Sequence, residues 1–386
     1  MIQSKKSLSV LYSLGFILAV STAFPAYIES TFLENFVDLR WVGLFFGGAM
    51  LATLAATLYF PYLIKKFTNY YLALTVLAVN FFSILLLILV NSPFLVFVFF
   101  TLFIVSISLI WINMDIFVET FSANPTTGFT RTLYFTLVNL GWVFSPFLVG
   151  YLLQTYDYRF IFWLAALLLL PVAIILLQQK PRFSFSVQYK GGSIKMAIKD
   201  MWHNLNLRNI FFVSLLLRVF YTFAVIYIPV YLNQNLGFSW SVIGLIFSFM
   251  LLPFIFLELP AGIIADKYLG EKEILIVGFS ILIISLLLMF FIQSVNPIIW
   301  GLMLFLSRCG AALVEAMQET YFFKNVDVPQ INYINIYRTA HPLSYFIGST
   351  LAVVLLTFFS LSYLFLFFAL VLLFGIYFAW QIKDTK

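Results

Sequence analysis

Two arginines stand inside long apolar runs of this sequence, where a charge is costly. Arg218 lies in the first half of the run 210–232, and Arg308 lies near the middle of the run 297–316. An arginine at the centre of an apolar helix costs about 2.5–3.5 kcal/mol on insertion scales, and such residues face a protein interior or a wet cavity. Because a guanidinium matches carboxylates and phosphates bidentately, the pair predicts a clamp for an anionic or polar small molecule. Alternatively, each arginine pairs with a buried glutamate and only holds helices together.

Three carboxyl groups lie in or at the ends of apolar runs, namely Glu258, Glu315 and Asp115. Because burial makes the charged form of a carboxyl costly, a carboxyl in such a place can take up and release protons. Glu315 follows Arg308 by seven residues, and so shares its side of a helix about 10.5 Å further along the axis. We expect these three carboxyls to serve in proton coupling. His341 is expected to be a structural hydrogen-bonding group.

Four further side chains are candidates for contact with the small molecule: Tyr27, Trp111, Asn113 and Tyr221. Aromatic residues make up 20% of the chain, so any one of the aromatic candidates could equally pack in the core or face lipid.

The sequence offers little that would support enzymatic chemistry. It has no phosphate-binding loop, and its two histidines and one cysteine are scattered. We therefore expect no ATP-driven pump, no catalytic residues, no metal site and no cofactor. Cys309 lies inside an apolar run, which excludes a disulfide framework.

The composition is that of a membrane protein. Of the 386 residues, 63% are hydrophobic and only 9% are charged, which is too few charges to cover a water-facing surface. Continuous apolar runs of about 20 residues favour membrane-spanning helices over a barrel, so an all-α fold is predicted. Twelve spans are predicted: Leu8–Ile28, Trp41–Tyr62, Leu72–Val90, Pro93–Met114, Leu133–Leu153, Phe160–Leu177, Ile210–Leu232, Trp240–Ala261, Ile274–Ile292, Pro297–Ala316, His341–Phe358 and Tyr363–Ile382.

The distribution of positive charge excludes nucleic acid as a partner, although the formal net charge is +6. Most of the 21 Lys and Arg residues fall at the two ends of the chain or in alternate loops, whereas only Arg40 and Arg159 fall in the loops of the other side. This asymmetry predicts that both termini lie in the cytoplasm.

Short stretches of the first half recur in the second half in the same order. The corresponding positions are Trp41 and Trp240, Pro61 and Pro260, Asp115 and Glu315, Glu119 and Glu319, and Arg131 and Arg338. Each arginine of the last pair is followed ten residues later by a glycine, Gly141 and Gly348. The repeat predicts two parallel six-helix halves, residues 1–177 and 210–386, joined by a linker at 178–209.

The linker contains a candidate amphipathic helix after the Gly191-Gly192 break. Ile194, Ala197, Ile198, Met201, Trp202 and Leu205 recur at helical spacing, with Lys195, Lys199, Asp200 and His203 between them. This pattern predicts a helix that lies on the inner leaflet, or alternatively a solvated helix that only connects the halves.

The stretch 258–273, ELPAGIIADKYLGEKE, has the order Gly262, Ala265, Asp266, Lys267 and then a glycine and a base. It resembles the loop signature between the second and third spans of each half in the major facilitator superfamily. Gly270 comes one residue late, and Glu271 stands where a base is usual. Because a glycine has no Cβ, we expect Gly262 to allow a close approach of two helices.

A second resemblance lies in the fifth span, where Gly141, Ser145-Pro146 and Gly150 are similar to the antiporter motif of the same superfamily. Ser145 and Val149 replace glycines of that motif.

The resemblance implies a twelve-span transporter that works by alternating access. It also implies a gate made of Gly262, Asp266 and Lys267 together with an inner-face charge network of Glu119, Arg131, Glu319 and Arg338. On this basis we expect a secondary transporter rather than an enzyme, and proton-coupled efflux by antiport. Uptake of an organic anion or another polar metabolite by proton symport is the alternative. An intramembrane enzyme or an assembly factor is the alternative outside transport.

The expected partners are a small-molecule substrate, protons and the lipid bilayer. We also expect a monomer in the inner membrane of a prokaryotic cell.

Overall fold

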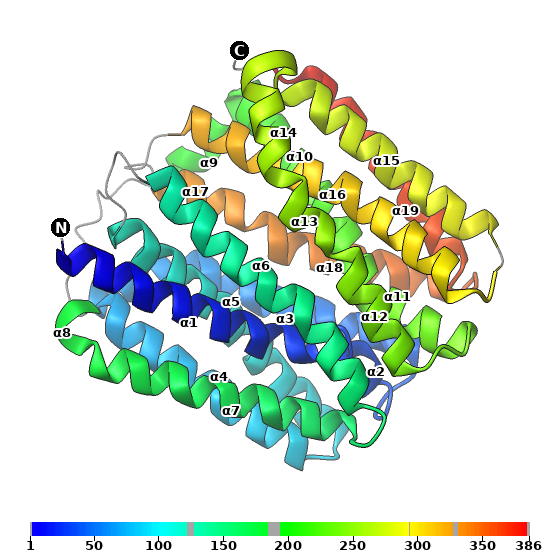
Figure 1. The fold of residues 1–386 in the computed structure, drawn as a ribbon, viewed down its shortest axis with the longest axis horizontal. Helices are drawn as coiled ribbons and strands as arrows, with labels where there is room; N and C mark the ends of the chain where they lie inside the picture. Colours follow the sequence, from blue (N-terminus) through cyan, green and yellow to red (C-terminus); the bar gives the residue numbers. More distant parts are fainter. Residues whose placement is uncertain (1, 122–126, 184–193, 293, 327–330, 384–386) are drawn as a thin grey trace. The chain divides into compact units, whose positions relative to one another are not determined.

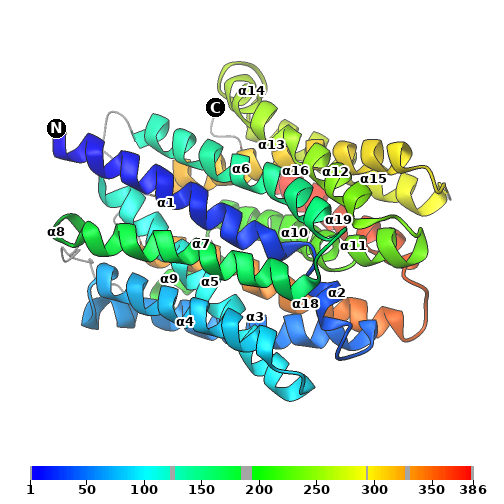
Figure 2. The same ribbon diagram turned by 60° about the horizontal axis from the view of Figure 1, so that its bottom comes forward.

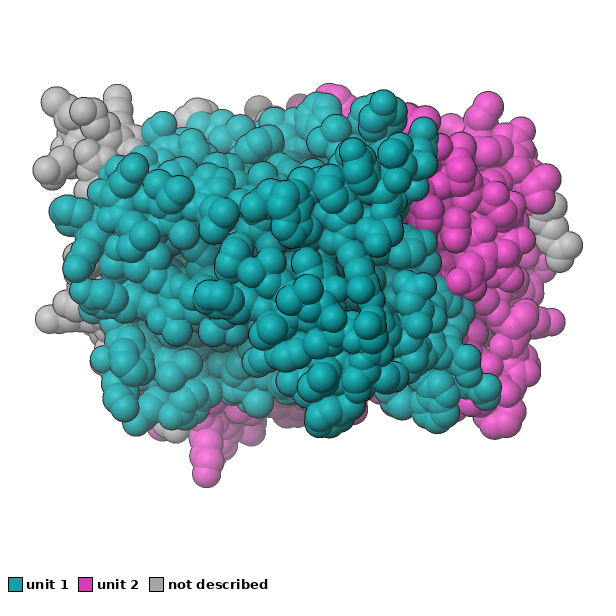
Figure 3. All heavy atoms as spheres, turned by 90° about the horizontal axis from the view of Figure 1, so that it is seen from below, with its two compact units in different colours: residues 1–188 teal, residues 189–386 magenta. Residues whose placement is uncertain are grey.

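The computed structural model describes residues 2–121, 127–183, 194–292, 294–326 and 331–383, and every regular element in these ranges is helical (Figure 1). Twelve stretches of the described residues are long and apolar enough to cross a membrane, which confirms the predicted number of spans. Contacts divide the chain into two compact units, residues 1–188 and residues 189–386, which are coloured separately in Figure 3.

The first unit contains six long helices and two short ones. They are α1 (Ile2–Ala26), α2 (Glu29–Leu33), α3 (Leu39–Lys66), α4 (Asn69–Leu89), α5 (Pro93–Phe121), α6 (Thr127–Leu152), α7 (Tyr158–Gln178) and α8 (Lys180–Phe183). Helix α1 packs against α6 and α7, and α5 packs against α3 and α4, as Figures 1 and 2 also show.

The second unit repeats this plan with more interruptions. It contains α9 (Ile194–His203), α10 (Leu205–Ile226), α11 (Ile228–Val230), η2 (Tyr231–Asn235), α12 (Trp240–Met250), α13 (Leu252–Phe256), α14 (Glu258–Ile264), η3 (Ala265–Leu269), α15 (Glu271–Phe291), α16 (Pro297–Asn325), α17 (Ile331–Arg338), α18 (Ala340–Leu356) and α19 (Tyr363–Gln381), where η marks a π-helical turn. Helix α10 packs on α16, α18 and α19, and α15 packs on α16 and α19.

The seventh and eighth spans are broken into segments where prolines occur. Pro229 and Pro253 each lie in the first turn of a new segment, α11 and α13. A proline has no N–H to donate to the preceding turn and its ring crowds that turn, so a helix restarts there.

Several helices are longer than the apolar runs from which they were predicted. Helix α16 continues to Asn325, beyond the predicted end at Ala316, so Glu315 and Glu319 lie within one helix. Helix α10 begins at Leu205, before the predicted start at Ile210, because the Oδ1 atom of Asn204 accepts hydrogen bonds from the N–H groups of Asn206 and Leu207. Hydrophobicity marks the lipid-spanning part of a helix, whereas capping marks its end.

The glycines at corresponding positions of the sequence repeat make equivalent contacts within each unit. A Cβ atom at Gly141 of α6 would lie 2.9 Å from the Cβ of Ala19 on α1. A Cβ atom at Gly348 of α18 would lie 3.2 Å from the Cβ of Thr222 on α10. In both units, therefore, a glycine of the fifth span brings that helix against the first span.

The closest helix approach around a glycine pair lies between α15 and α16. A Cβ at Gly310 would come 2.5 Å from the backbone oxygen of Gly278, and a Cβ at Gly278 would come 2.9 Å from the backbone oxygen of Gly310. Backbone atoms cannot move aside as a side chain can, so this crossing excludes even a methyl group.

We predict that Gly310→Ala destabilises the protein by about 1–3 kcal/mol, because the added methyl group must push α15 and α16 apart. Gly301→Ala on the same helix is the matched control, since its Cβ would meet no atom closer than 3.9 Å. Thermal unfolding of both variants in detergent measures the difference. Equal melting temperatures would show that the crossing is not tight.

Candidate functional site

The second unit brings five of the predicted site residues, four of them charged, into one cluster on three helices. The Oε1 atom of Glu319 on α16 forms ion pairs with two arginines. The Nη2 atom of Arg218 on α10 lies 3.7 Å away, and the Nη1 atom of Arg338 on α17 lies 3.0 Å away. The three side chains are 12–27% exposed, so their charges are only partly screened by solvent. On α10, one turn beyond Arg218, Tyr221 donates a hydrogen bond of 2.5 Å to Glu315 Oε2.

The register of α16 explains why both glutamates meet α10. Glu315 and Glu319 are four residues apart and therefore lie on one face of the helix, as do Arg218 and Tyr221 three residues apart on α10. Helix α17 is held against α16 by the ring of Tyr337, which stacks on Phe322 with centroids 4.0 Å apart. This stacking brings the adjacent Arg338 within reach of Glu319.

Arg308 differs from the other two arginines because it has no acidic partner in the described part of the chain. It is 2% exposed, its guanidinium lies over the rings of Phe220 (5.1 Å) and Tyr221 (5.8 Å), and its Nη1 atom has no hydrogen-bond partner there. A guanidinium over an aromatic face gains cation–π stabilisation, but its N–H donors still require acceptors. The two arginines that were predicted to clamp one ligand therefore differ. Arg218 is paired with Glu319, whereas Arg308 retains a donor without a partner among the described residues.

Two further ionisable groups border the cluster. Glu258, at the start of α14, interacts electrostatically with Glu315 and Glu319. His341 on α18 interacts electrostatically with Arg218 and Arg338, and the centroid of its ring lies 4.9 Å from that of Tyr345. Five helices thus contribute ionisable side chains to one region of the second unit.

The predicted site residues of the first unit are more widely separated. Tyr27 follows the end of α1, with its ring edge-on to Trp142 at 6.4 Å, whereas Trp111, Asn113 and Asp115 lie in the second half of α5. Successive spans alternate in direction, so Tyr27 lies toward one membrane boundary and the α5 residues lie toward the other. Tyr27 therefore does not lie in the same part of the unit as Trp111, Asn113 and Asp115.

Asn113 is buried, and its side chain is only partly satisfied. Its Nδ2 atom donates to the Leu109 carbonyl oxygen (2.7 Å), and its own backbone carbonyl oxygen accepts from Asn69 Nδ2 (3.2 Å). The Oδ1 atom of Asn113 has no partner among the described residues. Trp111 is partly exposed, and the charge of Asp115 acts on Tyr134 of α6.

Four predicted gate residues are described only by their backbone. Glu119 lies near the end of α5, Arg131 lies in the first part of α6, and Asp266 and Lys267 lie in η3. Their side chains lie outside the described part of the structure, so the predicted charge network is seen only as Arg338 and Glu319.

The late glycine of the loop signature has a structural explanation. Residues 265–269 form a π-helical turn, in which the Gly270 N–H donates to the Ala265 carbonyl oxygen five residues earlier (3.0 Å). A π turn accommodates one residue more than an α turn, so it absorbs the displacement of Gly270. Gly270 has φ = 93°, a conformation that favours glycine.

The acidic residue of the signature also has a partner within its own unit. Glu271, 1% exposed at the start of α15, accepts a hydrogen bond of 2.7 Å from Lys324 Nζ near the end of α16. Glu271, which departs from the superfamily pattern, thus forms an ion pair that links α15 to α16. No local pattern in the sequence indicates this pair, because 53 positions separate the two residues.

The close helix approach expected at Gly262 is not seen among the described residues of the second unit, since a Cβ atom there would meet nothing within 4 Å. Close approaches lie instead at Gly278 and Gly310. Both glycines lie within apolar runs and could have been recognised as small residues at helix interfaces.

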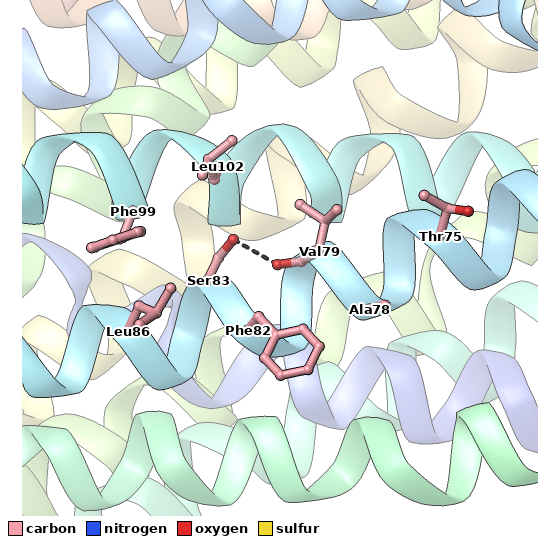
Figure 4. A pocket seen from close by; sticks show the side chains of 8 residues that line it. All are labelled: Thr75, Ala78, Val79, Phe82, Ser83, Leu86, Phe99 and Leu102. Atoms are coloured by element: carbon pink, nitrogen blue, oxygen red, sulfur yellow. Dashed lines mark hydrogen bonds between the residues drawn. The ribbon is translucent and has the colours of Figure 1, made fainter.

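A groove in the first unit, between α4 and α5, lacks the chemistry of a polar binding site (Figure 4). It is lined mainly by Val79, Phe82, Leu86, Phe99 and Leu102. Its two hydroxyl groups are already engaged, since Ser83 donates to Val79 O (2.6 Å) and Thr75 donates to Tyr71 O (2.9 Å). An open apolar groove on membrane-spanning helices fits lipid chains rather than a polar substrate.

Two units of six membrane-spanning segments, with ionisable side chains clustered inside one of them, define a polytopic membrane protein of the transporter class. The model of the Major Facilitator Superfamily matches residues 8–329, and the chain belongs to that superfamily. The chain is accordingly a secondary transporter, not an enzyme. Among the described residues, no group of three His, Cys, Asp or Glu side chains could hold a metal ion.

Solved structures of transporters share the fold. A mutant of the nucleoside transporter NupG is 13% identical, with a TM-score of 0.77 over 98% of this chain and 100% of that one. The peptide transporter POT in complex with sulfate is 12% identical, with a TM-score of 0.76 over 97% and 93% of the two chains. A bacterial homolog of the human lysosomal transporter Spinster is 10% identical, with a TM-score of 0.72 over 98% and 96%. No curated protein matches the sequence.

We predict that Glu319→Gln destabilises the protein by about 2 kcal/mol, because Arg218 and Arg338 lose the charge that they share. This is below the roughly 3–5 kcal/mol of a fully buried pair, since the side chains retain some solvent contact. Thermal unfolding in detergent measures the loss. Arg40→Gln is the control, because its pair with Asp38 is exposed and should contribute less than about 1 kcal/mol. An equal effect of both substitutions would contradict the prediction.

A buried carboxyl that the sequence analysis did not single out is Glu29, in the short helix α2 between the first two spans. Burial raises the pKa of its carboxyl from 4.5 to about 8. Between these values the folded protein holds a proton that the unfolded chain has released, so stability falls as the pH rises from 4.5 to 8 and then levels off.

We predict that Glu29→Gln removes this pH dependence. At pH 8 the variant should be more stable than the wild type, by on the order of 4 kcal/mol at most, and at pH 4.5 the two should be alike. Melting temperatures in detergent across this range provide the test. Parallel curves for the two proteins would show that Glu29 ionises normally.

Proposed function

We propose that this chain is a proton-coupled transporter that exchanges its substrate for protons, in the direction of efflux. The observation that carries the proposal is the cluster in the second unit. There Glu258 interacts with Glu315 and Glu319, and these two glutamates interact with Arg218 and Arg338. Proton uptake by one of these carboxyls changes the charge balance of side chains on α10, α14, α16 and α17 together. A ligand shifts a conformational equilibrium only if it binds the two states differently, and a proton arriving here meets that condition.

We assign the roles within the cluster from its contacts. Glu319 is the ionic anchor, because both arginines lie on its Oε1 atom. Glu315 and Glu258 are the proton carriers, because Glu315 has a neutral hydrogen-bond donor in Tyr221 and Glu258 faces two other carboxyls. A proton on Glu315 leaves the anchor intact, whereas a proton on Glu319 would release Arg218 and Arg338.

Antiport is supported by the fifth span, α6, which contains the antiporter-like motif. Pro146 lies inside this helix, and the Ser145 hydroxyl donates to the Gly141 carbonyl oxygen at 2.6 Å. The same Gly141 packs against Ala19 of α1. A small residue at the contact permits close packing of the two helices, and a proline inside the helix favours a bend.

Symport of an organic anion is the second candidate, and the unpaired Nη1 atom of Arg308 favours it. An anion bound there would face the ring of Tyr221, whose hydroxyl bonds to Glu315. Neutralising Arg308 removes a positive charge that stabilises the ionised cluster, so anion binding and proton uptake would favour one another. That reciprocity is the thermodynamic requirement for symport.

We further propose that the protein works as a monomer in the inner membrane of a prokaryotic cell, with both termini in the cytoplasm. The distribution of Lys and Arg supports this orientation.

Sealed proteoliposomes with a pH dye trapped inside distinguish the two candidates. In vesicles loaded acidic, a transported lipophilic cation should accelerate internal alkalinisation if the protein is an antiporter. Under an inward proton gradient, a transported small organic anion should accelerate internal acidification if it is a symporter. Proton flux of either kind should fall at least about tenfold in Glu258→Gln or Glu315→Gln, since each variant removes a proposed proton carrier.

Arg308→Ala separates the substrate roles, since it should abolish anion-driven acidification, whereas Arg40→Gln should not. A rate of substrate transport that does not depend on the pH gradient would overturn the proposal of proton coupling. So would wild-type proton flux in both glutamate variants.

A further inference from the structure

Helix α9 presents two different apolar surfaces. Ala197 and Met201 are buried, and the helix packs on α10 and α17. Ile198 and Trp202 are 44% and 53% exposed. At about 100° per residue, Ile198 and Trp202 lie about 40–80° from Ile194, directly beside the buried face. The apolar stripe is therefore wider than the protein surface that covers it.

Positive charge follows next around the helix. Lys195 and Lys199 lie about 100–140° from Ile194, and both are exposed. A lysine beside an exposed apolar stripe can bury its methylene stem while its ammonium group remains at the level of lipid headgroups. The order around α9 is thus protein contact, exposed apolar side chains and then two lysines.

The exposed stripe is continuous with the surface of membrane-spanning helices. The ring of Trp202 lies edge-on to Phe212 of α10, with centroids 5.7 Å apart, and Phe212 stacks on Phe378 of α19 at 4.7 Å. Phe212 lies near the start of α10 and Phe378 near the end of α19, so both mark the same membrane boundary. Lys272 at the start of α15 lies over the ring of Trp380 on α19 (4.9 Å), which adds another aromatic–cation pair at that boundary.

We propose that α9 lies in the headgroup layer of the bilayer, with Ile198 and Trp202 inserted among the acyl chains and Lys195 and Lys199 bound to anionic phospholipids. Apolar insertion beside a basic edge is the combination by which interfacial helices recognise such membranes. A helix that only connected the two units through water would leave Ile198 and Trp202 exposed to solvent.

The binding surface is connected to the ionic cluster. The Tyr333 hydroxyl of α17 donates to Asp200 Oδ2 of α9 at 3.2 Å, and α17 carries Arg338, which contacts Glu319. Lipid that restrains α9 therefore restrains the helix that supplies one arginine of the cluster, and anionic lipid stabilises the folded protein through this surface.

The test uses full-length protein with Cys309→Ala, in nanodiscs of phosphatidylcholine alone or mixed with phosphatidylglycerol. A single cysteine at Ile198→Cys carries an environment-sensitive fluorophore. Met196→Cys is the matched control, because Met196 is 66% exposed and lies about 200° from Ile194, beyond the lysines. The probe at 198 should emit at shorter wavelength and be quenched by lipids with brominated chains, more strongly with phosphatidylglycerol, whereas the probe at 196 should be quenched by aqueous iodide.

A second measurement compares melting temperatures in mixed micelles. Phosphatidylglycerol should raise the melting temperature of the wild type and of Arg40→Gln, and this rise should be lost in the double variant Lys195→Gln/Lys199→Gln. A probe at 198 that iodide quenches as readily as one at 196 would overturn the proposal. A rise that inorganic phosphate reproduces, or that survives the double substitution, would also overturn it. Neither measurement requires a substrate, so the result is independent of the proposed transport activity.

Discussion

The sharing of one carboxylate by two arginines is the interaction on which the second unit depends. Arg218, Glu319 and Arg338 come from three helices, and any one of them left alone would be a partly buried charge without compensation. The ionic contact therefore does more than stabilise the unit, because it links the positions of α10, α16 and α17. Glu315 interacts electrostatically with all three of these residues, so in the proposed cycle a change in its charge alters the balance of forces between the helices while the ion pairs remain.

Charge is unequally distributed between the two halves of the repeat. The second unit carries two arginines inside its spans, whereas the corresponding positions of the first unit are near Leu14 and Ser108, which are uncharged. The first unit instead keeps polar groups such as Asn113. A symmetric fold thus carries an asymmetric chemistry, and Arg308 stands out because the other two arginines are ion-paired with Glu319 whereas it has no acidic partner in the described part of the chain.

The parts of the structure that follow from hydrophobicity and repetition could be predicted from the sequence. The number of spans and their helical nature required only runs of apolar residues. The pairing of Arg218 with Glu319, and of Tyr221 with Glu315, depends on the register between α10 and α16, which are about a hundred residues apart in the chain. No local pattern encodes that register. For the same reason the sequence could not distinguish the paired Arg218 from the unpaired Arg308.

The loop signature shows how a departure from a family pattern can be accommodated. The extra residue before Gly270 requires a wider turn, and the π-helical η3 provides it without breaking the helix from which it continues. The reversed charge at Glu271 requires a base, and Lys324 of α16 provides one within the same unit. Each departure has its compensation nearby, so the signature keeps its helical turn while its acid contacts a neighbouring helix. A single glycine or charge matched to a motif is therefore a weak guide to its contacts, because the local backbone decides which helix each side chain reaches.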